Sequence, residues 1–188
     1  MLESTFLYAI SFPIYLILLF IEKKRGEKLK TIMLHSLFYF YVVAVMGVTL
    51  FPLPIAQSVI EHGRRYNYLE SNNFIPFKFI YDSIITLSYD LNAPFIPFWS
   101  SFAVVLRQVG GNILLTMPLG FLVPIIWKNR DTFIKTLIVG FWFSFGIEAS
   151  QFLISLILGY TYRITDIDDI ILNCTGCALG YLVYKSTF

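Results

Sequence analysis

The chain of 188 residues is 57% hydrophobic and only 14% charged, and its formal net charge is +2. A soluble domain carries about 25% charged residues, so this composition excludes a disordered chain and a typical water-soluble enzyme. The low net charge, with no basic stripe along one face, also excludes a strongly basic nucleic-acid-binding protein. Because a helix crosses a bilayer with about 20 apolar residues, the sequence predicts an all-α, polytopic membrane helix bundle of about five transmembrane helices, forming a single membrane domain over residues 1–188.

The apolar stretches that predict these spans cover residues 5–21, 32–53, 101–127, 132–158 and 167–184. The first and the last are close to the lower length limit for a span. The first stretch has Glu3 and no basic residue ahead of it, and no small-residue cleavage site follows it, which argues against a signal peptide. We therefore expect it to be an anchor with its amino end outside.

The connection between the second and third spans, residues 54–100, is not a plain polar loop. It contains ten aromatic residues, interleaved with charges. Aromatic rings are favoured at the membrane–water interface. We expect short helices lying at the level of the lipid headgroups, which either cap the bundle or form a lid over it.

The distribution of basic residues predicts the orientation. Nine of the 14 basic residues fall in the first loop, the loop after the third span, and the tail: Lys23, Lys24, Arg25, Lys28, Lys30, Lys128, Arg130, Lys135 and Lys185. Cytoplasmic loops of membrane proteins carry an excess of Lys and Arg. The prediction is a cytoplasmic carboxyl end, with the amino end and residues 54–100 outside.

Polar side chains recur at helical spacing within the last three predicted spans. A charged side chain within a bilayer costs a few kcal/mol unless it is paired or hydrated, so such residues need a reason. They lie on one face of each helix: Gln108, Asn112 and Thr116; Ser144, Glu148, Gln151 and Ser155; Asp166, Asp169, Asn173 and Gly176.

Helical rise places these three faces at a similar depth in the outer half of the membrane, below Arg107 and Arg163. Two interpretations remain open, namely interhelical hydrogen bonding and a shared, water-accessible ligand site. We favour the site, because three carboxylates exceed what helix packing requires. Its predicted ligand-binding residues are Arg107, Asn112, Glu148, Gln151, Arg163, Asp166, Asp169 and Asn173. The arginines could pair with Asp166, with Asp169 or with a ligand anion.

The sequence gives little indication of a metal site or of redox chemistry. Cys174 and Cys177 lie within an apolar span without further soft ligands nearby, so we expect them to be small packing residues. Gly176 and Gly180 form a Gly-x-x-x-Gly pattern that predicts close helix packing within the bundle. We expect no cofactor and no resident metal.

Several motifs together resemble the VanZ-like family, which takes its name from a teicoplanin-resistance protein. They are Thr49–Pro52 (TLFP), Asn73–Phe77 (NFIPF), Asn112–Phe121 (NILLTMPLGF), Glu148–Gln151 (EASQ), and Arg163–Ile170 (RITDIDDI) continuing through Asn173, Gly176 and Gly180. The resemblance implies a multi-pass protein of the bacterial cytoplasmic membrane, associated in named members with low-level resistance to teicoplanin and related lipoglycopeptides. It implies no established reaction.

The leading hypothesis is a protein that binds or shields an amphiphile at the outer leaflet, either a lipoglycopeptide or a lipid-linked cell-wall precursor. The alternative is an intramembrane enzyme that modifies a lipid headgroup or a polyprenyl phosphate, with Glu148 or Asp169 as general base. A third possibility is a scaffold for other envelope proteins. Membrane lipids are expected partners in each case.

Overall fold

The computed structural model describes residues 1–66, 72–92 and 98–188. The described residues form seven α-helices and no strand, with a short 3-10 helix at Lys128–Arg130. The helices are α1 Ser4–Lys24, α2 Leu29–Leu50, α3 Gln57–Tyr66, α4 Lys78–Asn92, α5 Phe98–Ile126, α6 Phe133–Leu158 and α7 Ile167–Thr187. The predicted all-α membrane bundle is confirmed.

Each of the five expected spans coincides with a long helix, but hydropathy separates one from the others. In the described part of the chain, four helices are long and apolar enough to cross a membrane: α1, α2, α5 and α6. The fifth, α7, is as long as α1 but carries Asp168 and Asp169 in its first turn. These polar groups lower its mean hydropathy. Both are engaged inside the protein, Asp169 by Asn112 of α5 and Asp168 by the backbone of Phe77 and Phe79.

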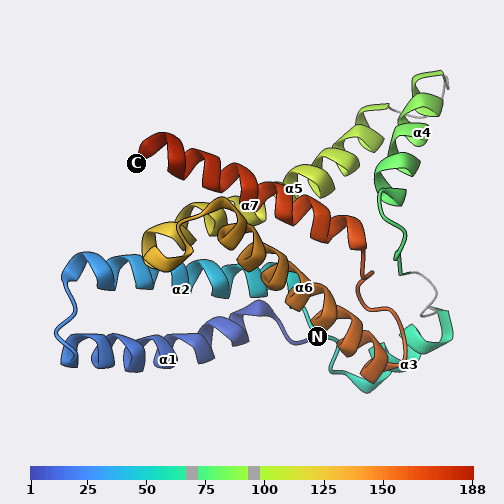
Figure 1. Ribbon diagram of the computed structural model, residues 1–188. Coiled ribbons are helices and arrows are strands. Elements are labelled where there is room, and N and C mark those ends of the chain that lie inside the picture. The colour runs from blue at the N-terminus through green and yellow to red at the C-terminus, as the bar shows by residue number, and fades with distance from the viewer. Residues whose placement is uncertain (67–71, 93–97) are drawn as a thin grey trace.

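Two arrangements of helices make up the bundle (Figure 1). Helices α1 and α2 form a hairpin, in which the Tyr39 hydroxyl donates to the Ser11 carbonyl at 2.6 Å. Helix α7 crosses directly against α5, and α6 runs beside both. The polar faces of α5, α6 and α7 therefore meet inside the molecule.

Glycines allow the close approach of α5 and α7. A Cβ atom added to Gly176 would fall on the Ile113 carbonyl oxygen, and one added to Gly180 would fall on that of Met117. From the opposite side, a Cβ atom on Gly120 would meet the Cys177 carbonyl. The Gly-x-x-x-Gly pattern thus packs α7 against α5, as the sequence predicts. Cys177 is buried in the same contact.

The connection between α2 and α5 contains the short helices α3 and α4, as expected. Helix α3 lies against the loop after α6, where the Arg64 Nε donates to the Leu158 carbonyl at 2.6 Å. Helix α4 stands away from the bundle (Figure 1) and exposes large apolar side chains such as Tyr81, Ile84 and Tyr89. Tyr68 and Phe95, two of the aromatic residues noted in the sequence, lie outside the described residues.

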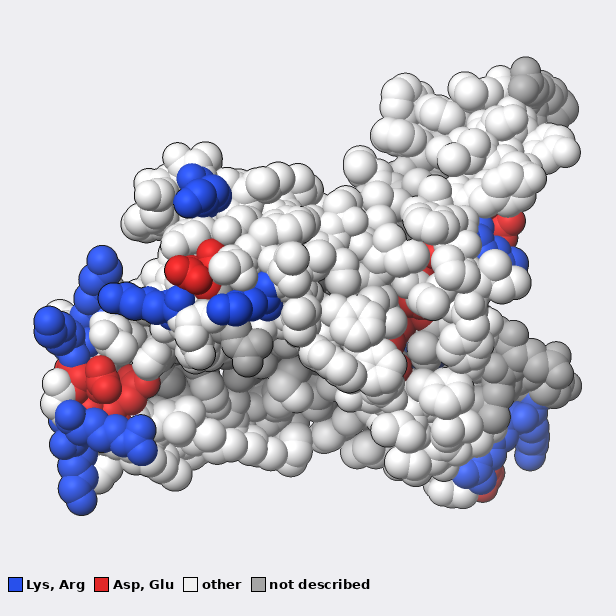
Figure 2. All heavy atoms as spheres, viewed as in Figure 1, with Lys and Arg blue, Asp and Glu red and all other residues white. Residues whose placement is uncertain are grey.

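Basic side chains gather at one end of the molecule, over the α1–α2 loop, the α5–α6 connection and the end of α7 (Figure 2). A smaller basic group lies at the other end, on α3. The long apolar helices run between these two ends. The polar faces described next lie away from the larger basic group, near the start of α7.

Candidate functional site

A polar cavity of about 320 Å³ lies where α2, α5, α6 and α7 meet. Seven of the eight residues predicted from the sequence line it: Arg107, Asn112, Glu148, Gln151, Arg163, Asp169 and Asn173. Gln108 and Thr49 complete its polar wall, and Val48, Leu115 and Ile147 supply apolar surface. Four helices, together with Arg163 from the loop between α6 and α7, therefore contribute to one cavity.

Asp169 is held in this cavity by amides from α5. The Asn112 Nδ2 donates to the Asp169 Oδ1 at 2.5 Å, and Gln108 also bonds this carboxylate. Two helical turns of α5 thus present amide donors to one carboxylate on α7. Within the described residues, no cation lies within 4.0 Å of Asp169. Its charge is compensated by hydrogen bonds rather than by an ion pair.

Glu148 is almost fully buried, with 4% of its surface exposed. Its Oε2 accepts the backbone N–H of Asp166 at 3.0 Å, which ties α6 to the first turn of α7. Among the described residues it too has no cationic partner within 4.0 Å. Burying an unpaired carboxylate costs free energy, so helix packing alone does not explain a glutamate at this position.

The two arginines have different roles. The Arg163 Nη2 donates to the Val48 carbonyl at 3.1 Å and the Phe51 carbonyl at 2.5 Å, which caps the carboxyl end of α2. Its Nε is buried without a partner in the described structure. Arg107 is exposed on the cavity wall. Of the pairings considered for these arginines, those with Asp166 and Asp169 are absent from the described residues, because amides and backbone N–H groups already surround those carboxylates.

Asp166 differs from the other predicted site residues because it does not line the cavity. It caps α7 by accepting the N–H of Asp168 at 2.8 Å, and it accepts the Asn73 Nδ2 at 2.7 Å. Burial raises the pKa of Asp166, and these two hydrogen bonds oppose that rise. Its described contacts are structural.

Asp168 was not predicted as a site residue, yet it is completely buried. Its Oδ1 accepts the N–H of Phe77, and its Oδ2 accepts the N–H of Phe79 at 2.8 Å. Nearby, the backbone of Asn73 bonds to Thr165 and Ile167. The start of α7 therefore anchors the segment that leads into α4. In the sequence, the run Asp166-Ile167-Asp168-Asp169 indicates the start of a helix. It does not indicate that Asp168 bonds the distant backbone of Phe77 and Phe79.

Asn173 lies at the deepest part of the polar face and is 2% exposed. Its Nδ2 donates to the Ser144 hydroxyl at 2.8 Å, and its backbone carbonyl accepts the Thr116 hydroxyl at 2.6 Å. Its Oδ1 has no partner in the described structure. Buried polar atoms almost always have a partner, so this enclosed acceptor is an exception among the contacts of α5, α6 and α7.

Removing the Thr116 hydroxyl is expected to destabilise the protein by about 1 kcal/mol. Thr116→Val keeps the shape of the side chain but removes the hydroxyl donor that the Asn173 carbonyl accepts in addition to its bond within α7. Unfolding of the purified protein in mild detergent measures the change. Thr175→Val is the matched control, because the exposed Thr175 hydroxyl bonds only within its own helix. An equal loss in both variants would contradict a specific role for the Thr116 bond.

The cavity brings charged side chains and amides together on one wall. The described residues contain no group of three or more His, Cys, Asp or Glu side chains arranged to hold a metal ion. Two guanidinium groups, two carboxylates and several amides can instead recognise a ligand that carries anionic and hydroxyl or amide groups.

Comparison with known proteins places the chain in a family. A model of the family described as VanZ/LLP1 matches residues 38–188. No curated protein and no solved structure matches the chain. The matched region includes every residue that lines the polar cavity.

Proposed function

The chain belongs to the VanZ/LLP1 family, and we propose that it binds an amphiphile at the outer leaflet of the bacterial cytoplasmic membrane. The polar cavity takes the anionic and hydrogen-bonding head of the ligand, and the apolar tail stays among the lipids. The ligand is a lipoglycopeptide such as teicoplanin or a lipid-linked cell-wall precursor. Binding would shield the precursor or sequester the antibiotic, giving low-level resistance.

The observation that carries this proposal is the set of unused polar groups on the cavity wall. Arg107 has no carboxylate within 4.0 Å among the described residues. The Arg163 Nε and the Asn173 Oδ1 are buried without partners there. A bundle held together only by interhelical hydrogen bonds would satisfy such groups. The exposed Arg107 guanidinium can pair with an anionic group of a ligand, and the amides of Gln108 and Asn112 lie on the same cavity wall.

Positive charge supports the outward placement of the cavity. The larger basic group covers the end of the bundle formed by the α1–α2 loop and the end of α7 (Figure 2). If this end faces the cytoplasm, as positive loops do, the cavity at the start of α7 belongs to the outer half. Helices α3 and α4 then lie on the outer side, beside the cavity.

Arg107→Gln is expected to weaken binding of the amphiphile about tenfold, because a charge-assisted hydrogen bond contributes about 1.5–3 kcal/mol. The measurement is the affinity of purified protein for fluorescently labelled teicoplanin, together with the susceptibility of bacteria that express each variant. Arg65→Gln is the control, because it removes an exposed arginine of α3 that does not line the cavity. Equal protection by both variants at equal protein level would contradict the proposal, as would the absence of protection by the unaltered chain.

The second candidate function is an intramembrane enzyme. It is favoured by one observation, that Glu148 and Asp169 line the same cavity without a cationic partner in the described residues. Such a carboxylate can accept a proton from a hydroxyl of the substrate. Incubation of purified protein with membrane lipids distinguishes the two functions. A product of altered mass that disappears in Glu148→Gln supports the enzyme, whereas saturable binding without a product supports the binding protein.

A further inference from the structure

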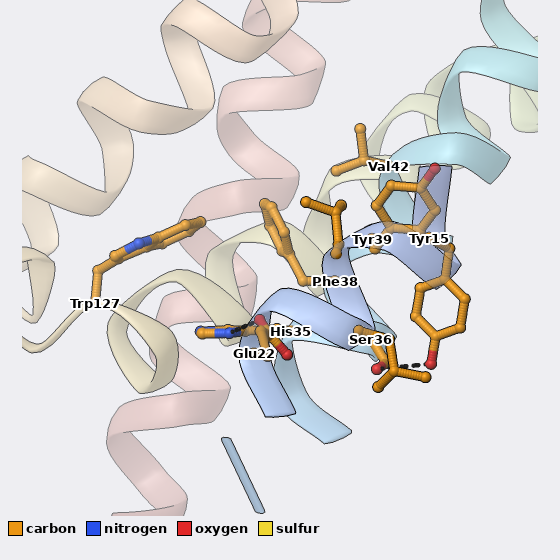
Figure 3. Close-up of a pocket in the computed structure, with 10 residues that line it drawn as sticks. Tyr15, Glu22, His35, Ser36, Phe38, Tyr39, Val42 and Trp127 are labelled. Carbon is orange, nitrogen blue, oxygen red and sulfur yellow. Dashed lines mark hydrogen bonds and ion pairs between the residues drawn. The ribbon is translucent and has the colours of Figure 1, made fainter. Parts of the chain in front are cut away.

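The α1–α2 hairpin forms two clefts in the half of the molecule that carries the larger basic group. Both clefts are lined by Tyr15, Leu19 and Ser36, and neither shares a residue with the polar cavity. Figure 3 shows the first, which has a volume of about 360 Å³ and is bordered by Trp127. There the Glu22 carboxylate bonds the His35 Nδ1 at 2.6 Å. The Glu22 carboxylate is therefore engaged in the first cleft, and a second carboxylate, Glu27, lies in the loop between the two helices.

The second cleft is an apolar groove with two lysines at its edge. Its volume is about 870 Å³, and it is lined by Tyr15, Leu19, Lys23, Leu29, Lys30, Ile32, Met33, Leu34, Ser36 and Leu37. Lys23 comes from the end of α1 and Lys30 from the start of α2. Neither has a carboxylate within 4.0 Å among the described residues. The groove thus joins an apolar floor to two unpaired positive charges from different helices.

The start of α2 adds to the positive character of this groove. Lys28 occupies the position before the helix, no side chain caps the first N–H groups, and the first turn contains no acidic residue. The amino end of a helix carries a partial positive charge that favours an anion. Leu29 and Met33, which line the groove below it, are 74% and 64% exposed. Anionic and apolar parts of one ligand would therefore be adjacent.

We propose that this groove is a specific site for an anionic phospholipid of the leaflet next to the basic end of the molecule. Lys23, Lys30 and the start of α2 hold the phosphate group, and one acyl chain lies along the apolar groove toward Tyr15. Basic side chains at the membrane surface attract anionic lipids, but here two of them converge on a groove that also accommodates the chain. The site is independent of the ligand bound in the polar cavity.

The test compares two phospholipids with identical acyl chains on delipidated protein in detergent. Native mass spectrometry measures the dissociation constants of phosphatidylglycerol and phosphatidylcholine. Phosphatidylglycerol is expected to bind about tenfold more tightly. That preference is expected to disappear in Lys23→Gln/Lys30→Gln. It is expected to persist in Lys24→Gln/Arg25→Gln, which removes the same charge from the same end of the hairpin without altering the lining of the groove.

Three outcomes would overturn the proposal. Equal binding of the two lipids would show that the groove accepts acyl chains without selecting between headgroups. An equal loss of preference in both double variants would assign it to the diffuse charge of the loop. Displacement of phosphatidylglycerol by glycerol phosphate, which lacks acyl chains, would indicate a site for a free phosphate. A final variant, Leu37→Trp, fills the groove and is expected to weaken both lipids while leaving the two lysines in place.

Discussion

Replacing Gly180 by alanine is expected to destabilise the protein by about 2 kcal/mol, although only one methyl group is added. The added Cβ would fall on the Met117 carbonyl oxygen of α5. The obstacle is backbone rather than a flexible side chain, so α7 must move away from α5. Because the Asn112–Asp169 and Thr116–Asn173 hydrogen bonds join the same two helices, this movement would also open the polar cavity.

Gly146→Ala provides the matched comparison. Gly146 lies in α6, and an added Cβ there meets nothing within 4 Å. Alanine also favours a helix over glycine by about 1 kcal/mol, so this variant is expected to be at least as stable as the unaltered chain. Unfolding in mild detergent, followed by the loss of helical circular dichroism, measures both. If Gly180→Ala proved as stable as Gly146→Ala, the close α5–α7 contact would be wrong.

Asp168→Asn is expected to have the largest effect of any single polar substitution, about 3 kcal/mol. Each carboxylate oxygen accepts a backbone N–H, one from Phe77 and one from Phe79. Asparagine has only one acceptor oxygen, so an NH₂ group would face a backbone N–H in a fully buried position. The segment from Asn73 to Phe79 would then detach from the start of α7. Helix α4, which follows this segment, would lose its attachment to α7.

Limited proteolysis of the purified protein reports this release directly. Cleavage within residues 72–92 is expected to be faster in Asp168→Asn than in the unaltered chain. Asp82→Asn is the control, because Asp82 is an exposed acidic residue on α4. Identical cleavage rates in the two variants would show that Asp168 does not hold the outer segment.

The features that the sequence predicts well are those that depend on local periodicity. Apolar length identifies the long helices, and spacing of three and four residues identifies the polar faces that contain Asn112, Glu148 and Asn173. Each of these faces can be assigned without knowing what it contacts, because polar groups within a bundle of apolar helices must turn inward. The family resemblance is confirmed for residues 38–188.

Features that depend on contacts between distant segments cannot be predicted from local periodicity. Asp166 and Asp168 look like site residues or solvated charges, but Asp166 caps α7 and Asp168 binds backbone more than 80 residues away. Arg163 resembles a ligand-binding arginine, yet it caps the end of α2 with one of its nitrogens. The fifth predicted span illustrates a related limit. Among the described residues, α7 is not one of the four helices long and apolar enough to cross a membrane, although its polar side chains form hydrogen bonds with other segments, as Asp169 does with Asn112 of α5.

The proposed function requires that the polar cavity is open to water from outside the cell. A single cysteine at Gly111 tests this most directly, in a chain that also carries Cys174→Ser and Cys177→Ala. Gly111 lines the cavity, and an added Cβ meets nothing within 4 Å, so the thiol fits. Leu114→Cys, one helical turn away, is the comparison, because Leu114 is 67% exposed on the apolar surface outside the cavity.

The measurement is labelling of intact cells with a membrane-impermeant maleimide. Thiols react as thiolates, which form in water but not among lipid chains. The account predicts that Gly111→Cys is labelled from outside, that Leu114→Cys is not, and that a bound amphiphile protects Gly111→Cys. Labelling of Leu114→Cys alone, or of neither position in correctly inserted protein, would contradict a water-accessible cavity at this site.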